Sequence, residues 1–284
     1  MDLKTKKNFK DNRVAILVVG YDGYESLWPP FFELLRKNWI DCPFKIYLVT
    51  NELQPNFFNV EVIKTKSNFQ WSKKVRTALK YIKEDYVIML LEDFFICYDV
   101  DTLSVLKCIE FSFENNIKYV KMPYYGLNEK RNSKFKDSDI YYSILQNEKY
   151  GISLLPGLWE KNFLINLIGT ENYNPWKFEV NMIKEAYKHA AIPFTDCMLD
   201  NRNLLNIYNG VIQGEFVRDT YKRIVSQGVN VDLSVINLMT KKNEIILMLK
   251  RVGIKLVPSS LEPLVKKIAN KFGIKFVSDI NSNM

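Results

Sequence analysis

Blocks of apolar residues with two different spacings follow one another along the first half of the chain. Consecutive apolar runs are typical of strands buried on both faces, and apolar residues that recur every three or four positions are typical of one face of a helix. The runs predict strands at residues 14–19, 44–50, 60–63, 86–91 and 119–122. The helical spacing predicts helices at residues 28–39, 71–83 and 101–115. This alternation predicts an α/β fold: one Rossmann-like domain with a mainly parallel central sheet and helices on both faces.

The second half of the chain is less regular. Residues 151–216 are rich in Trp, Gly, Pro and acidic residues, which is typical of a segment that builds a substrate pocket. Residues 230–276 have a basic and helical pattern. We therefore expect a main domain at residues 1–225 and a basic helical C-terminal extension at residues 226–284.

The polar end of the strand at residues 86–91 is the most informative position in the chain. Five apolar residues, Val87 to Leu91, run directly into Glu92 and Asp93. Two carboxylates are costly to bury unless something pairs with them, and ligands of open α/β sheets bind at the carboxyl ends of the strands. We therefore expect the two acids to face a cation, such as a divalent metal ion that carries phosphates. A salt-bridged strand end is the alternative.

Composition limits the choice of metal and of chemistry. The chain has 284 residues, of which 47% are hydrophobic, and this is ample for one large core. His189 is the single histidine, which excludes a multi-histidine zinc site. A metal held by oxygen ligands is expected to be Mg²⁺ or Mn²⁺. The four cysteines have no CxxC spacing and are expected to be reduced.

The net charge of +8 is concentrated near the C-terminus. Residues 241–284 contain nine Lys and Arg residues and three acidic residues, which leaves a net charge of +2 on residues 1–240. A nearly neutral main domain argues against a nucleic-acid partner. In the extension, apolar residues from Leu261 to Phe272 follow helical spacing with lysines between them. This pattern predicts a helix on an anionic membrane surface, and a helix packed on the main domain fits it equally well.

The expected location follows from two features of the sequence. No apolar run approaches the roughly 20 residues of a membrane helix. Residues 1–13 are polar and lysine-rich and lack the apolar stretch of a secretory signal. We expect a cytoplasmic protein, with the inner face of the cytoplasmic membrane as the second location if the extension binds lipid.

The acidic strand end comes after a helix that begins Trp71-Ser-Lys-Lys-Val-Arg76, and this order of motifs resembles a known family. A strand that ends in Leu-Leu-Glu-Asp-Phe, after a helix with Ser and Arg, is similar to the nucleotide-sugar-dependent glycosyltransferases of the A-type (GT-A) fold. The bacterial capsule and lipopolysaccharide branch of that family has the most similar acidic motif. The similarity covers residues 13–216. The chain departs from the family's commonest Asp-x-Asp pattern, because Glu92-Asp93-Phe94 replaces it.

The resemblance implies a GT-A fold with a nucleotide-sugar donor and a metal ion at the strand ends. Asp93 is then the metal ligand and Glu92 its support, because adjacent strand residues point to opposite faces. The ion stabilises the charge that develops on the leaving diphosphate. Asp22 and Asn51 follow the first two strands, and the resemblance places the nucleoside against them. Ordinary turn chemistry is the stronger explanation of both residues.

Ser72 and Arg76 are the remaining candidates for nucleotide-sugar binding. They lie four residues apart and therefore share one face of the helix at residues 71–83. From that face Arg76 is expected to reach a diphosphate or a nucleobase oxygen. A surface arginine near a serine cap fits the same spacing.

Two tryptophans and two acids are the candidates on the acceptor side. Trp159 and Trp176 are the expected stacking platforms for a sugar, because aromatic rings pack on its apolar faces. Glu179 lies where the resembling enzymes have a catalytic acid, and an aromatic pocket gives a carboxylate the raised pKa of a general base. Asp200 is the second catalytic candidate, together with Asp196. Core packing of the aromatic rings is the alternative.

Residues 210–216 predict a strand and turn that close over the diphosphate, followed by a basic stretch that begins at Arg218. A plain solvated stretch explains those basic residues better.

Taken with the resemblance, these residues predict a hexosyltransferase-like enzyme. It moves a sugar from a nucleotide-sugar donor to a hydroxyl of a surface polysaccharide or lipid-linked glycan, with assistance from a metal ion. The alternative among enzymes is a nucleotidyl or sugar-phosphate transferase, which uses the same acids but attacks phosphorus. The alternative from another class is a non-catalytic carbohydrate- or membrane-binding protein.

Overall fold

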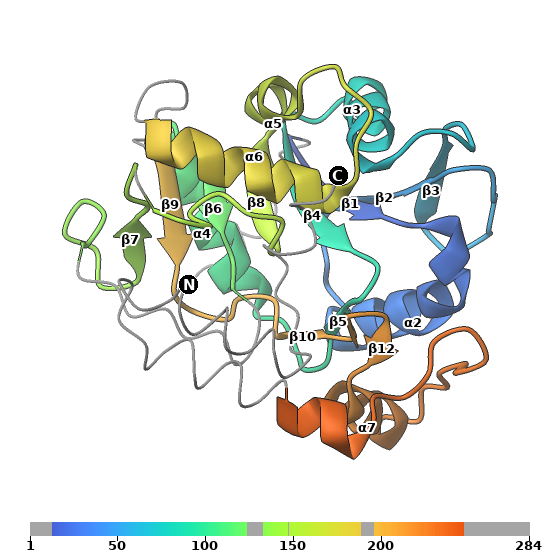
Figure 1. The fold of residues 1–284 in the computed structure, drawn as a ribbon. Coiled ribbons are helices and arrows are strands. Elements are labelled where there is room, and N and C mark those ends of the chain that lie inside the picture. The colour runs from blue at the N-terminus through green and yellow to red at the C-terminus, as the bar shows by residue number, and fades with distance from the viewer. Residues whose placement is uncertain (1–12, 124–132, 147, 189–195, 247–284) are drawn as a thin grey trace.

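An eight-stranded sheet forms the centre of the computed structural model, which describes residues 13–123, 133–146, 148–188 and 196–246 (Figure 1). The strands of this sheet are β1 (Val14–Val19), β2 (Lys45–Thr50), β3 (Val60–Lys64), β4 (Tyr86–Leu91), β6 (Tyr119–Lys121), β7 (Tyr141–Ser143), β8 (Gly157–Glu160) and β9 (Cys197–Asp200). Their spatial order is β3-β2-β1-β4-β8-β6-β9-β7. Strands β1 to β4 are parallel, β6 is parallel to β9, and β8 and β7 run antiparallel to their neighbours. The predicted α/β class with a mainly parallel central sheet is confirmed.

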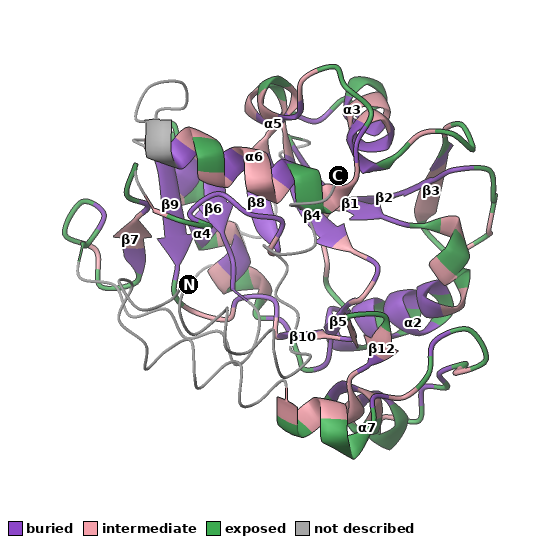
Figure 2. Ribbon diagram, in the orientation of Figure 1, coloured by how far each residue is buried: buried purple, intermediate pink, exposed green. Residues whose placement is uncertain are grey.

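Helices cover both faces of this sheet, so that its strands lie buried between two layers (Figure 2). The helices are the 3-10 helix η1 (Asp22–Leu27) and the α-helices α2 (Trp28–Asn38), α3 (Trp71–Tyr81), α4 (Thr102–Glu114), α5 (Lys161–Ile168), α6 (Pro175–Lys188) and α7 (Arg218–Ser226). Successive residues of β1 point to opposite faces. Ile16 belongs to the core under α2 and α4, and Leu17 belongs to the core under α3, α5 and α6.

The elements predicted for the first half of the chain are confirmed, with ends that differ by at most two residues. Burial on both faces explains this agreement for β1, β2 and β4, because each of these strands needs only one continuous apolar run. The N-terminus of α4 also follows from local chemistry: the Asp101 side chain accepts a hydrogen bond from the main-chain N–H of Leu103 at 3.1 Å.

Residues 151–216 contain elements that the sequence pattern did not predict. Strand β8 inserts between β4 and β6, and its first residue, Gly157, lies opposite Met89 and Lys121. Two small antiparallel ladders complete the fold. They pair β5 (Phe94–Ile96) with β10 (Ile207–Asn209), and β11 (Val211–Ile212) with β12 (Glu215–Phe216).

The core continues beyond the expected domain end at residue 225. Val229 and Ile236 are buried in the same cluster as α2 and β5. The main chain of Phe216 also bonds to residues 237 and 239, at 2.8 Å each. The described part of the expected extension, up to residue 246, therefore begins as part of the main domain. The apolar pattern from Leu261 to Phe272 and the lone His189 lie outside the described residues.

Two further expectations concern the described residues. All four cysteines are free, as expected, and three of them are buried. Within the described ranges, every helix is too short or too polar to cross a bilayer.

Candidate functional site

The carboxyl ends of β1, β2 and β4 meet at one edge of the sheet, because these strands are parallel neighbours. Three consecutive residues after β1 bind three different elements there. The carbonyl of Gly20 accepts a hydrogen bond from Lys74 of α3, and the N–H of Tyr21 donates to Glu92 Oε1 at 2.9 Å. The carboxylate of Asp22 accepts from the loop after β2. The three strand ends therefore form one hydrogen-bonded unit.

Glu92 and Asp93 follow β4 at this edge. Glu92 is 7% exposed and Asp93 is half-buried. Burial, and after it the charge of Asp93, raises the pKa of Glu92 to about 8, and burial raises the pKa of Asp93 to about 7. Two neighbouring acids with raised pKa values are typical of a functional site that binds a positively charged ligand.

The hairpin of β11 and β12 lies directly against Asp93. The N–H of Gly210 donates to the Asp93 carbonyl at 2.7 Å, and the main chain of Val211 hydrogen-bonds to its carboxylate. A side chain at Gly210 has no room, since a Cβ would lie 2.2 Å from the Phe95 ring. The predicted strand and turn at residues 210–216 are confirmed as this hairpin. Its closure over a diphosphate stays a prediction.

The acidic pair fits a hard divalent ion only in company with other oxygen ligands. The described residues contain no group of three or more His, Cys, Asp or Glu side chains that could hold a metal ion by themselves. Mg²⁺ is commonly held by one or two carboxylates together with substrate phosphates and water. Glu92 and Asp93 therefore fit an ion that arrives with a diphosphate, and this role stays a prediction.

Asp22 and Asn51 shape the loops at the nucleoside end of the predicted site. The Asp22 carboxylate accepts from the N–H groups of Asn51, Glu52 and Leu53 at 2.8, 2.7 and 3.0 Å. Burial raises the pKa of Asp22, but these hydrogen bonds and the charge of Lys74 outweigh it, so that the net shift is downward. The Asn51 amide donates to two carbonyls of residues 66 and 69, at 2.8 Å each. Both side chains thus hold loop backbone, as turn chemistry predicts, and their contact with a nucleoside stays a prediction.

Ser72 and Arg76 bind the segment that contains α5 and the residues after it. The Ser72 hydroxyl donates to the Glu171 carbonyl at 2.7 Å and accepts from the N–H of Tyr173 at 2.8 Å. Arg76 donates to the carbonyls of Ile165 and Gly169, at 3.2 and 2.7 Å, and so binds the C-terminal end of α5. Ser72 is fully buried, and its hydroxyl already makes both of these hydrogen bonds. The structure therefore gives it a role in packing instead of ligand binding. For Arg76, a contact with the nucleotide stays a prediction.

Lys74 is the residue of this site that the sequence analysis missed. It is 4% exposed, and it lies with Trp71, Val75 and Ala78 on the buried face of α3. A lysine at an apolar position of the helical repeat is the signal that could have identified it, because an ammonium group is buried only with partners.

Glu179 lies on α6, next to the loop that precedes β8. Its Oε1 accepts a hydrogen bond from the N–H of Leu154 at 3.1 Å. Leu154 belongs to the loop before β8, which starts opposite Met89 near the end of β4. Burial raises the pKa of Glu179, and the Leu154 N–H and the charge of Lys121 oppose the shift. A half-buried carboxyl with a raised pKa fits a general base, and this role stays a prediction.

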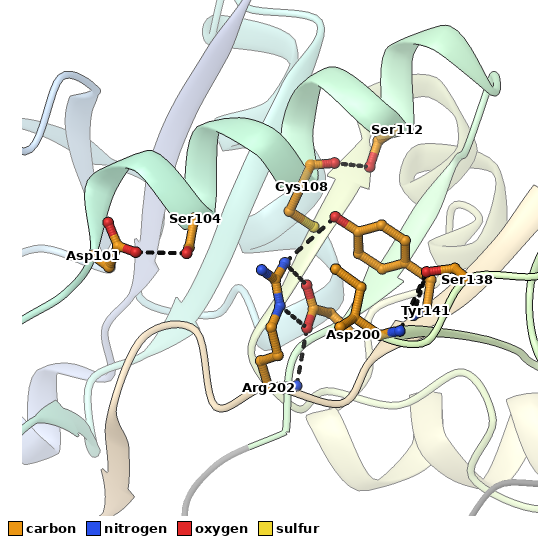
Figure 3. A network of polar contacts seen from close by, with 9 residues as sticks. Asp101, Ser104, Cys108, Ser112, Ser138, Tyr141, Asp200 and Arg202 are labelled. Carbon is orange, nitrogen blue, oxygen red and sulfur yellow. Dashed lines mark hydrogen bonds and ion pairs between the residues drawn. The ribbon is translucent and has the colours of Figure 1, made fainter. Parts of the chain in front are cut away.

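Asp200 forms a buried ion pair at the end of β9, with no exposed surface of its own (Figure 3). Arg202 donates from Nε and Nη2 to the two carboxylate oxygens at 3.0 and 2.6 Å, and its main-chain N–H donates at 2.9 Å. Arg202 also donates to the Tyr141 hydroxyl at 3.4 Å. A bidentate guanidinium neutralises this carboxylate, so the structure gives Asp200 a structural role in place of the predicted catalytic one. Asp196 forms an ion pair with Lys118 at 2.8 Å.

The two tryptophans lie in opposite environments. Trp159 of β8 is completely buried, and its ring packs on Tyr119 with 4.0 Å between the ring centroids. The prediction that Trp159 stacks on an acceptor sugar is therefore corrected, because its face is covered by the core. Trp176 is 56% exposed in the first turn of α6, three residues before Glu179. Its predicted acceptor contact is sterically open and stays a prediction.

A cavity of about 340 Å³ lies away from these acids, between the C-terminal end of α2 and α7. Polar side chains that line this cavity bind other residues of the protein. Asn38 donates to Gln227 Oε1 at 3.0 Å, and Arg223 forms an ion pair with Asp219 at 2.9 Å. The acidic strand end remains the stronger candidate, because it lies where the carboxyl ends of three parallel strands meet, and ligands of open α/β sheets bind at that edge.

Comparison with known proteins gives similarity of fold only. No family model and no curated protein matches the chain. Among solved structures, the chain is similar to residues 1–349 of S. aureus TarS, at 16% identity over 78% of this chain and 67% of that one, with a TM-score of 0.46. It is similar to the same protein in complex with UDP-GlcNAc, at 18% identity over 78% and 68%, with a TM-score of 0.46. It spans 41% of a longer TarS structure. It is also similar to a cytidylyltransferase from Leptospira borgpetersenii, at 11% identity over 68% and 78%, with a TM-score of 0.42.

Proposed function

We propose that the chain is a glycosyltransferase that moves a sugar from a nucleotide-sugar donor to a hydroxyl group of a glycan acceptor, with assistance from Mg²⁺ or Mn²⁺. The observation that carries the proposal is the pair Glu92 and Asp93, two acids with raised pKa values that follow β4 where the ends of parallel strands meet. Ligands of open α/β sheets bind at that edge. A metal ion bound to a diphosphate would add positive charge beside this pair.

On the donor side, the protein's own contribution is charge and fixed geometry. Asp93 would hold the ion, and Glu92 would support it while keeping its bond to the N–H of Tyr21. When bound, the ion stabilises negative charge on the leaving nucleoside diphosphate. The loops that Asp22 and Asn51 hold would frame the nucleoside, because their backbone is fixed before the ligand arrives.

On the acceptor side, Glu179 would take the proton from the attacking hydroxyl. A base must take up a proton to do this, and burial, which raises the pKa of Glu179, increases its proton affinity. The exposed ring of Trp176, one turn earlier on α6, would pack on the apolar face of the acceptor sugar.

A surface polysaccharide or a lipid-linked glycan is the acceptor class that we propose, from the resemblance of the acidic motif. The basic, apolar pattern from Leu261 to Phe272 supports attachment to an anionic membrane, where a lipid-linked acceptor would lie. This part of the proposal rests on the sequence alone.

Isothermal titration with UDP, GDP and CMP, with and without Mn²⁺, tests the proposal. One nucleotide should bind more tightly with Mn²⁺ than without it, and Asp93→Asn should abolish the difference. The matched control is Asp99→Asn, which removes an exposed carboxylate after β5. Absence of binding to all three nucleotides would favour a non-catalytic protein.

A panel of nucleotide sugars then distinguishes the reaction. A glycosyltransferase hydrolyses its donor slowly in the absence of acceptor and releases free sugar and nucleoside diphosphate. Cleavage that needs pyrophosphate and yields sugar phosphate and nucleoside triphosphate would show a nucleotidyltransferase instead.

A further inference from the structure

Lys74 is a buried lysine at the centre of the proposed donor site. It reaches the ends of two strands from helix α3. Its ammonium group donates to the Gly20 carbonyl after β1 and to Asn51 Oδ1 after β2, the latter at 3.1 Å. One side chain therefore joins the two loops against which a nucleoside is proposed to lie.

The partners of Lys74 have fixed orientations. The Asn51 amide nitrogen donates to the carbonyls of Lys66 and Phe69, at 2.8 Å each, so its oxygen can face only the ammonium group. The backbone of Gly20 is also held in place, because its N–H donates to the Val49 carbonyl at 3.0 Å. If the ammonium group were removed, two buried acceptors would lose their donor, which costs more than the bonds themselves contribute.

The charge of Lys74 also interacts with acids from two of these elements. The carboxylates that act on its charge are those of Glu92, after β4, and Asp22, after β1. Glu92 is bonded to the residue next to Gly20, through the N–H of Tyr21. A displacement of the Gly20 carbonyl would therefore also displace the support of the acidic pair.

We infer that Lys74 is a positioning residue, whose ammonium group holds the loops after β1 and β2 in the arrangement that a metal-bound nucleoside diphosphate requires. The inference rests on the proposed function and adds to it a residue that acts through Gly20 and Asn51. If Lys74 served folding alone, its replacement would change the stability of the protein but not the affinity of the folded protein for a nucleotide.

The test compares variants of the full chain by isothermal titration in the presence of Mn²⁺. The probe is whichever of UDP, GDP and CMP the wild-type protein binds. Lys74→Met keeps the length of the side chain and removes its charge and donors. We expect it to weaken binding by about tenfold or more, which equals about 1.4 kcal/mol. Lys74→Arg keeps charge and donors and should recover part of the affinity.

Lys80→Met is the matched control, because it removes the same charge from the exposed face of the same helix. It should leave the affinity unchanged. Each titration is run below the unfolding temperature of the variant, so that a loss of affinity is not a loss of folded protein.

Three outcomes separate the inference from the proposed function. A folded Lys74→Met protein with wild-type affinity overturns the inference and leaves the glycosyltransferase proposal intact. If Lys74→Met does not fold, Lys74→Leu decides, since it is neutral and removes every donor; wild-type affinity in that variant likewise overturns the inference. A wild-type protein that binds none of the nucleotides overturns the proposed function, and the inference with it.

Discussion

The main-chain N–H of Tyr21 lies 2.9 Å from Oε1 of Glu92, although the two residues are 71 positions apart in the chain. This bond joins the loop after β1 to the acid after β4. The first acid of the pair is thus oriented by backbone, and the second, Asp93, lies against the hairpin at Gly210. The two acids therefore have separate supports, and substitutions can test them one at a time.

Asp93→Asn should lower turnover of the nucleotide sugar by at least ~10²-fold, because the metal ion would lose its charged ligand. The fold should survive, since the substitution removes a charge that burial disfavours. Donor hydrolysis and thermal unfolding measure the two effects. Full activity of the variant, or of the wild-type protein in excess EDTA, would remove the metal assignment.

Glu179→Gln keeps the size of the side chain but cannot accept a proton. If Glu179 is the base of an inverting transfer, the rate should fall by ~10²–10⁴-fold while nucleotide affinity stays unchanged. Glu185→Gln makes the same chemical change two turns later on α6 and should have no such effect. An equal loss of donor affinity in Glu179→Gln would instead identify a binding or structural residue.

Stability in metal-free buffer should fall as the pH rises from about 4 to about 8. The pKa of Glu92 rises from 4.5 to about 8 on folding, and that of Asp93 rises from 3.8 to about 7. A group with a raised pKa binds its proton more tightly in the folded state, so its stabilisation is complete at low pH and is lost as the pH passes the folded value. Urea unfolding in EDTA across this range measures the slope.

Glu92→Gln removes one of these titrating groups and should therefore flatten the dependence of stability on pH. Glu110→Gln, at an exposed position of α4, should leave the slope as it is in the wild-type protein. A steeper slope in Glu92→Gln would contradict the assignment of the shift to this acid.

Asp200→Asn should destabilise the protein by about 3 kcal/mol, at the lower end of the range for breaking a buried ion pair, because Arg202 retains some contact with water. Nucleotide affinity of the folded variant should not change. The double variant Asp200→Asn with Arg202→Met should be less destabilised than the sum of the single variants. Chemical unfolding of the four proteins measures the coupling, and strict additivity would contradict the pairing.

Gly210→Ala should displace the β11–β12 hairpin from Asp93, because the new methyl group would overlap the Phe95 ring. We expect a loss of about 1–3 kcal/mol in stability, as for other overpacked sites. Hydrogen exchange at the Gly210 and Val211 main-chain N–H groups reports the displacement directly. Unchanged protection at both positions would show that the ring can move aside.

The sequence by itself determined the strands and helices of the first half and the place of the acidic pair. Strands β1, β2 and β4 each contain a single apolar run, and the run in β4 ends at Leu91, immediately before Glu92. Strands buried on both faces leave this record in consecutive residues, so no distant partner is needed to recognise them.

Only the tertiary structure decided which polar and aromatic side chains already have hydrogen-bond or packing partners within the protein. Spacing placed Ser72 and Arg76 on one helix face, but their partners lie about 90 to 100 residues away, at Gly169 and Glu171. Trp159 lost its predicted role because β8 inserts between two distant strands. The partners of Lys74 likewise come from distant parts of the chain, since they follow β1 and β2. A local pattern fixes the face on which a side chain lies, whereas its partner depends on which segments the chain brings against that face, and that choice is made by long-range packing.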